Sequence, residues 1–167
     1  MTPWHRRTLV ACATGEFLCL AVWIGGLVVI IGSVIPAVFN SFGMEPGGRF
    51  LTRVFGGYDR LVSIASAVML SCLGLRSWLR RQVGFGPSWT EVAVLATMVL
   101  IACLIMGVLG PKSIALQEQA FAVAEEADKK EAYSAFFAVH NLVRGLYLAN
   151  LGLGISLLTV KVKQFQR

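Results

Sequence analysis

Two uninterrupted apolar segments constrain this chain more than any other feature of its sequence. Residues 17–36 and residues 92–111 each run for 20 residues without a charged side chain. A helix of that length rises about 30 Å, which matches the thickness of the hydrocarbon core of a bilayer. Each segment therefore predicts a helix that crosses a membrane.

Two shorter apolar segments, residues 61–75 and 145–160, extend the pattern. The first reaches residue 79 if Arg76 extends to the headgroups, and the second reaches back through Arg144 toward residue 136. Only 14% of the residues are charged, against about 25% in a typical soluble domain. We therefore predict an all-α, polytopic membrane protein. It is a four-transmembrane-helix bundle in one domain, residues 1–167, with helices at about 9–36, 61–79, 92–111 and 136–160.

The connections between these helices carry further predictions. Pro36 and Pro111 are expected to end the first and third helices, because proline interrupts helical hydrogen bonding. Residues 37–60 mix aromatic and arginine side chains, which is typical of a segment at headgroup level. Residues 112–134 place apolar side chains at spacings of three and four, which predicts an amphipathic helix on the membrane surface, in the second outer loop. The similar halves hint at two duplicated hairpins.

Basic residues predict the orientation in the membrane. One side holds only one acid, Glu91, and eight basic residues: Arg6, Arg7, Arg76, Arg80, Arg81, Lys161, Lys163 and Arg167. The other side holds seven basic and seven acidic residues. The short basic loop and the termini favour an N-in, C-in orientation, whose basic side meets anionic lipids of the cytoplasmic leaflet. The sequence has no pattern typical of nucleic-acid binding.

Glu16 permits two interpretations. If the first helix begins near Phe17, Glu16 lies at the interface, which is the expected case; if it begins near Leu9, Glu16 is buried and needs a partner. Helix packing is predicted from small residues, namely Ser63, Ala67 and Ser71 on the second helix and Gly145 and Ala149 on the fourth.

His140 and Arg144 lie one helical turn apart in the segment FFAVHNLVRG. Counting about 20 residues back from Val160 places the outer membrane boundary near Asn141. Both side chains can then extend to the headgroups as anchors. They can also face the bundle interior and form a polar outer-face site with Asn141, Asp59 and Arg49, in which Asp59 would pair with Arg144. Both interpretations stay open at this level.

A soft-metal site is a weaker hypothesis. Met69 with Cys72, and Cys103 with Met106, each share a helical face, and sulfur ligands suit copper(I). The same residues are ordinary fillers of apolar cores, and that interpretation is favoured. No catalytic triad, phosphate-binding loop, carboxylate pair or Cys-x-x-Cys motif is present, so the sequence favours a protein that is not an enzyme.

Four segments together resemble the transmembrane protein 205-like family of four-helix membrane proteins. They are AVWIGGLVVIIGSVIPAVFNSF, GGRFLTRVFGGYDRL, GPKSI and FFAVHNLVRG, one from each predicted helix or its end, in the same order. The positions that carry the resemblance are Trp23, Gly25, Gly26, Pro36, Phe39, Gly48, Arg49, Phe55, Gly110, Pro111 and His140. Where the family often has a basic residue shortly before the histidine, this chain has FFAV, and Arg144 follows instead.

The resemblance implies function classes, because the family is largely without assigned activity but is similar to copper-resistance D-type membrane proteins. Many members are bacterial, which implies a bacterial inner (cytoplasmic) membrane, and some animal members are linked to export of platinum compounds. It therefore favours transport of, or resistance to, a metal ion or small toxic compound, in a chain expected to form a homo-oligomer. A related haem-dependent protoporphyrinogen oxidase implies the alternative of a haem-binding membrane oxidoreductase with His140 as axial ligand. A third alternative is a non-catalytic membrane scaffold or assembly module. Haem and copper are the cofactors that these classes imply.

Overall fold

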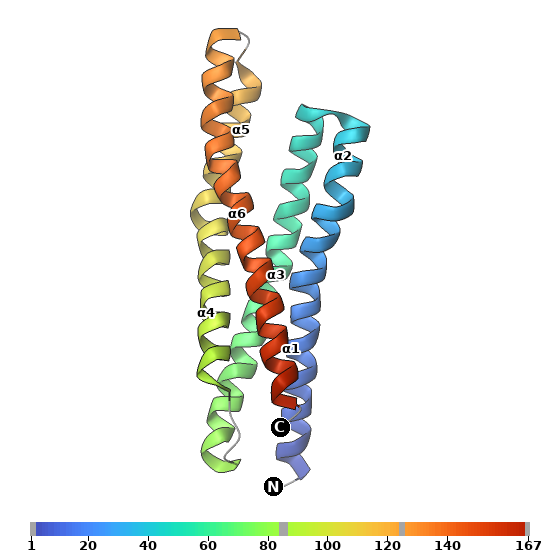
Figure 1. The fold of residues 1–167 in the computed structure, drawn as a ribbon, viewed down its shortest axis with the longest axis vertical. Coiled ribbons are helices and arrows are strands. Elements are labelled where there is room, and N and C mark those ends of the chain that lie inside the picture. Colours follow the sequence, from blue (N-terminus) through green and yellow to red (C-terminus); the bar gives the residue numbers. More distant parts are fainter. Residues whose placement is uncertain (1–2, 84–86, 124–125, 166–167) are drawn as a thin grey trace.

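The structure, a computed structural model, describes residues 3–83, 87–123 and 126–165, and these contain helices and no β-strand. The first hairpin comprises α1 (Pro3–Val29), the π-turn η1 (Ile30–Val34), α2 (Ile35–Phe42) and α3 (Met44–Val83). The second hairpin comprises α4 (Trp89–Leu104), the π-turn η2 (Ile105–Leu109), α5 (Gly110–Ala122) and α6 (Glu126–Phe165). Both chain termini lie at one end of the molecule, the termini end; the α2–α3 and α5–α6 turns lie at the other, the hairpin end (Figure 1).

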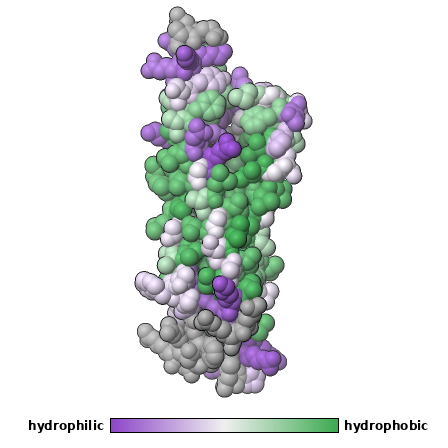
Figure 2. All heavy atoms as spheres, in the orientation of Figure 1, coloured by the Kyte–Doolittle hydropathy of each residue, from purple (hydrophilic) through white to green (hydrophobic). Residues whose placement is uncertain are grey.

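The predicted all-α bundle with four membrane-spanning helices is confirmed. The four apolar spans are Pro3–Phe42, Met44–Leu79, Trp89–Ala122 and Asp128–Gln164. On the face shown in Figure 2, a broad hydrophobic band covers the middle of the molecule, and hydrophilic side chains are concentrated toward its ends. The protein is therefore built to be embedded in a lipid bilayer.

The two prolines do not end their helices, which corrects the predicted ends at residues 36 and 111. The N–H of Ile35 donates to the carbonyl of Ile30, and the N–H of Gly110 donates to the carbonyl of Ile105. These bonds span five residues instead of four and widen the helix by one residue. The wider turn accommodates the following proline, which has no N–H to donate. Each helix therefore continues beyond its proline.

Both predicted outer loops are helical, and the helix predicted in the second outer loop is present as α5, although it continues along the bundle and does not lie across its end. Residues 37–60 form the end of α2 and the start of α3, joined at Gly43, whose φ of 74° is in the region that favours glycine. The segment α5 continues the direction of α4 beyond η2 and packs along α6, with Gln117 and Ala120 buried (Figure 1). The amphipathic character of α5 thus serves packing between helices.

The core lies where α1 packs on α3 and α6, and α4 packs on α6. The Tyr58 hydroxyl of α3 donates to the carbonyl of Trp23 in α1 at 2.8 Å. The same ring covers Gly26, where an added Cβ would lie 3.0 Å from a ring carbon, whereas a Cβ on Gly25 would meet nothing within 4 Å. Trp23 and Gly26 therefore mark a close contact between α1 and α3.

The predicted small-residue faces do not form the close helix contacts of this bundle, although Ser63 meets Met106 of the second hairpin. Ser63, Ala67, Ser71, Gly145 and Ala149 are exposed. Other residues make the close contacts, because the rotation of each helix places a different face inward. On α6 the close approach occurs at Gly154, where an added Cβ would lie 3.0 Å from Ile24 of α1.

Candidate functional site

Four ionisable side chains, one from each long helix, meet inside the termini end. They are Glu16 of α1, Arg76 of α3, Glu91 of α4 and Lys161 of α6. Glu16, Glu91 and Lys161 are only 3%, 1% and 4% exposed, and the Arg76 side chain is 15% exposed. We call this set the ion network. Its formal charges sum to zero, which suits a site with little access to water.

Each hairpin contains one acid and one base of the ion network, and they pair with each other. In the first hairpin, Arg76 Nη1 lies 2.9 Å from Glu16 Oε2. In the second, Lys161 Nζ lies 2.6 Å from Glu91 Oε1. Two further pairs cross between the hairpins: Arg76 Nη1 to Glu91 Oε1 at 2.6 Å, and Lys161 Nζ to Glu16 Oε2 at 2.7 Å. The network therefore joins the two hairpins at the termini end.

Neighbouring polar groups hold Glu91 in place. Ser88 precedes α4 as its N-cap, and its hydroxyl accepts a hydrogen bond from the Glu91 backbone N–H at 3.2 Å. The Gln164 amide donates to Ser88 Oγ and to Glu91 Oε2, both at 3.1 Å. An acidic residue in the first turn also interacts favourably with the helix dipole. Glu91 is thereby fixed by backbone, side-chain and charge interactions together.

The ion network was missed at the sequence level. Arg76 and Lys161 were expected at the headgroups and Glu16 at the interface, but α1 begins at Pro3 and carries Glu16 inside the bundle. The available signal was one ionisable residue per helix near the same end, two acidic and two basic. Of the predicted basic cluster, Arg167 lies outside the described residues, as do the side chains of Arg80 and Arg81.

A second polar site lies at Asp59, about 25 Å along α3 from Arg76 at 1.5 Å per residue. The Tyr147 hydroxyl of α6 donates to Asp59 Oδ1 at 2.8 Å. The Tyr147 ring packs on Phe55, with ring centroids 5.1 Å apart. Asp59 was predicted to pair with Arg144, but it pairs with Tyr147. Arg144 is exposed.

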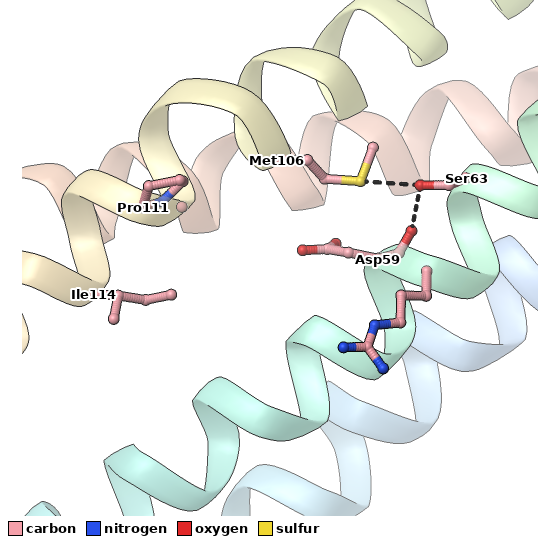
Figure 3. Close-up of a pocket in the computed structure, with 7 residues that line it drawn as sticks. Asp59, Ser63, Met106, Pro111 and Ile114 are labelled. Atoms are coloured by element: carbon pink, nitrogen blue, oxygen red, sulfur yellow. Dashed lines mark hydrogen bonds between the residues drawn. The ribbon is translucent and has the colours of Figure 1, made fainter.

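Beside Asp59, an open pocket of about 270 Å³ separates the two hairpins. Its lining includes Asp59, Arg60 and Ser63 of α3, and Met106, Pro111 and Ile114 of the second hairpin (Figure 3). Ser63 Oγ lies 2.8 Å from the Asp59 carbonyl oxygen and 3.3 Å from Met106 Sδ, so it bridges the hairpins at one side of the pocket. This pocket could not be predicted from local sequence, because its two walls are more than 40 residues apart along the chain.

The hairpins also touch near their tips. The Arg49 guanidinium lies 3.2 Å from Glu118 of α5 and 3.3 Å from Glu45, and its carbon is 5.8 Å from the Phe121 ring centroid. An added Cβ on Gly48 would lie 3.3 Å from the same ring, whereas Phe39 packs within its own hairpin against Gly47. Arg49 and Glu118 are each half exposed, so their pair contributes little stability.

The other predicted outer-face residues lie on the surface of α6. His140, Asn141 and Arg144 are exposed. The His140 ring stacks near Phe136, with centroids 5.2 Å apart, and Arg144 lies close to it. Arg49 pairs with Glu45 and Glu118, and Asp59 pairs with Tyr147, so the predicted five-residue site is not assembled in the described part of the chain. His5 lies on α1 at the termini end, far along the bundle from His140 (Figure 1).

The predicted soft-metal residues lie in different surroundings. Met69 is in the core, Met106 lines the pocket, and Cys103 is exposed. Cys72 lies between these extremes, near Gly15 of α1. Among the described residues, no three or more His, Cys, Asp or Glu side chains come together in a way that could hold a metal ion. The copper hypothesis therefore remains a prediction.

Four long apolar helices with buried, mutually paired charges define a polytopic α-helical membrane protein. The chain belongs to the family described as "Domain of unknown function (DUF4149)", whose model matches residues 18–122. The match includes Arg76, Glu91, Asp59 and the pocket, and stops before α6. No curated protein and no solved structure matches the chain. The resemblance to the transmembrane protein 205-like family stays a prediction.

Proposed function

We propose that this membrane protein carries a small compound or metal ion across the bilayer and so confers resistance to it. The observation that carries the proposal is the division of the ion network between the hairpins. Each hairpin holds its own pair, Glu16 with Arg76 or Glu91 with Lys161. The hairpins can therefore part at the termini end and leave no carboxylate without a cation.

The energetic reason is the cost of an unpaired charge in a low-dielectric site. Removing one partner of a buried ion pair typically costs about 3–5 kcal/mol. Within the ion network, parting of the hairpins breaks the cross-hairpin ion pairs, Arg76 with Glu91 and Lys161 with Glu16, and the hydrogen bond from Arg76 to Gln164. A network that splits into two neutral halves suits a gate that opens and closes, and transporters with repeated halves move in this way.

The opposite end supports the same mechanism. The pocket beside Asp59 opens between the two hairpins, while the ion network closes the termini end. With the predicted N-in, C-in orientation, this arrangement is an outward-facing state. The π-turns η1 and η2 lie along the helices between the two ends, and such turns are places where helices bend. Because one four-helix bundle encloses little volume, we propose that the transporting unit is a homo-oligomer.

Accumulation of toxic compounds in cells tests the proposal. The full chain is expressed in a bacterial host that lacks its own efflux pumps, and uptake of ethidium, copper and cadmium is measured. We expect the wild-type chain to lower accumulation of at least one probe. The combined exchange Glu91→Lys and Lys161→Glu keeps the pair within the second hairpin but places like charges across the gate, and should abolish the effect.

Two results would contradict transport. The first is equal accumulation of every probe in cells with the wild-type chain and with an empty vector, at equal membrane levels of protein. The second is a haem absorption band in the purified protein that is lost in His140→Ala, which would favour the haem-binding alternative.

A further inference from the structure

We infer that the pocket beside Asp59 binds a small monovalent organic cation with apolar substituents. The inference deepens the proposed function by naming the class of substrate, and it rests on that function only for the direction of movement. Binding itself can be measured without transport.

The charge of the pocket is the first argument. Asp59 lies within an apolar span, and only its Oδ1 accepts a hydrogen bond, from Tyr147. Among the described residues, no basic side chain forms an ion pair with Asp59, and Oδ2 receives no donor. The carboxylate reaches into the space facing Pro111 and Ile114 (Figure 3). An acidic group in this position is a functional residue by default, and a bound cation would supply its missing partner.

The apolar wall is the second argument. Met106, Pro111 and Ile114 face Asp59 across the pocket. Methionine adapts its shape to different apolar groups. The volume of about 270 Å³ is slightly below the range of about 300–1,000 Å³ for drug-sized ligands, so the ligand is small. One carboxylate opposite an apolar wall matches a ligand with one positive charge and apolar substituents.

The π-turn also leaves one backbone carbonyl, that of Met106, without its helical donor. In a regular helix the Met106 carbonyl would accept from the N–H of Gly110, but this N–H donates to Ile105. The next residue is Pro111, which has no N–H. The Met106 carbonyl therefore lacks its usual backbone donor, and carbonyls freed in this way contribute to cation sites in transporters.

Arg60 limits the charge of the ligand. It also lines the pocket, and its exposed side chain can extend toward the headgroups. Because Asp59 is the one acidic residue of this lining and Arg60 is basic, a second positive charge on the ligand would have no carboxylate to pair with, so the site favours a monovalent cation.

Equilibrium titration of the full chain in lipid nanodiscs tests the inference with benzyltrimethylammonium, and with benzenesulfonate as an anion of similar size. We expect saturable binding of the cation and none of the anion. Asp59→Asn keeps an oxygen that can accept from Tyr147 but removes the charge, and should weaken cation binding at least about tenfold, or 1.4 kcal/mol. The matched control is Asp128→Asn, an exposed position at the start of α6, which should bind as wild type does.

Several outcomes would overturn the inference. They are equal cation binding by the wild type and Asp59→Asn, tighter binding of benzenesulfonate than of the cation, and binding of sodium ions alone. If Asp59→Asn does not fold, a photoreactive azidobenzyl-trimethylammonium on the wild type replaces it. Crosslinks to Met106 or Ile114 would support the site, and crosslinks elsewhere would overturn it. Asp59-dependent binding without any change in cellular accumulation would contradict transport but leave the binding site intact.

Discussion

Arg76 and Glu91 belong to different hairpins, yet Arg76 Nη1 lies 2.6 Å from Glu91 Oε1 inside the termini end of the bundle. Each of them also pairs within its own hairpin, Arg76 with Glu16 and Glu91 with Lys161. Arg76 and Glu91 would therefore each keep an oppositely charged partner if the contact between the hairpins were broken.

The gate is tested by the exchange Glu91→Lys with Lys161→Glu. Like charges would then face each other across the hairpins, so the termini end should open. Cys12 is 5% exposed and lies one turn before Glu16 on α1, which makes it a native reporter. With the other three cysteines replaced by alanine, we expect Cys12 to react faster with a maleimide in the exchanged protein than in the unexchanged one.

The same experiment has a restoring control. Adding Glu16→Arg and Arg76→Glu reverses the first hairpin as well, and should return the slow reaction of Cys12. If the rate of Cys12 labelling is the same in all three proteins, the hairpins do not separate at the termini end.

Removal of a single charge from the ion network should lower the free energy of unfolding more than the exchange of Glu91 and Lys161 does. Lys161→Met leaves two buried carboxylates with only Arg76, and we expect a loss of about 3–5 kcal/mol in the free energy of unfolding. Denaturant titration in detergent micelles measures this loss. Lys163→Met is the matched control, since Lys163 is exposed on the same helix, and should change stability little. Equal effects of the two substitutions would show that the ion network does not stabilise the bundle.

The π-turn before Pro111 should tolerate no side chain at position 110, where the chain has Gly110. An added Cβ would lie 2.9 Å from the Ile105 carbonyl oxygen, which is closer than the atoms can approach. We expect Gly110→Ala to cost about 1–3 kcal/mol, as overpacking typically does. Gly107→Ala, where a Cβ meets nothing within 4 Å, should be neutral or stabilising. A lower melting temperature for Gly107→Ala than for Gly110→Ala would contradict this account of η2.

Substitution of Gly25 and of its neighbour Gly26 by alanine should have different effects on stability. Gly26→Ala places a Cβ 3.0 Å from the Tyr58 ring and should destabilise the contact between α1 and α3 by about 1–3 kcal/mol. Gly25→Ala meets open space and serves as control. Thermal unfolding of the two variants measures the difference. If both unfold at the same temperature, Tyr58 does not constrain α1 at this position.

The positions of His140 and Arg144 illustrate where sequence reasoning reached its limit. Their spacing correctly indicated one shared helical region, but it was compatible with an inward or an outward face. The two side chains are exposed, and the inward polar positions of α6 are Tyr147, Asn150 and Lys161. The amide of Asn150, 2% exposed, donates to the Met98 carbonyl at 3.3 Å. The rotation of α6 about its own axis decides which of its side chains face inward. That rotation depends on the contacts of α6 with α1 and α4.

The prolines show the same limit in the backbone. Pro36 and Pro111 indicated an interruption of helical hydrogen bonding, which is present in both helices. An interruption can end a helix or widen one turn, and local sequence is compatible with either. Here α2 and α5 pack on α3 and α6, which favours the continued helix. Packing of residues distant in sequence made the choice.

The sequence by itself determined that four apolar helices cross a membrane, because long apolar segments, two of them charge-free for 20 residues, can satisfy their backbone groups in lipid only as helices. It did not determine which charges meet. Glu16, Arg76, Glu91 and Lys161 are up to 145 residues apart along the chain. Only the relative rotation and axial register of the four packed helices bring them within hydrogen-bonding distance, and those quantities are set by side-chain contacts between helices.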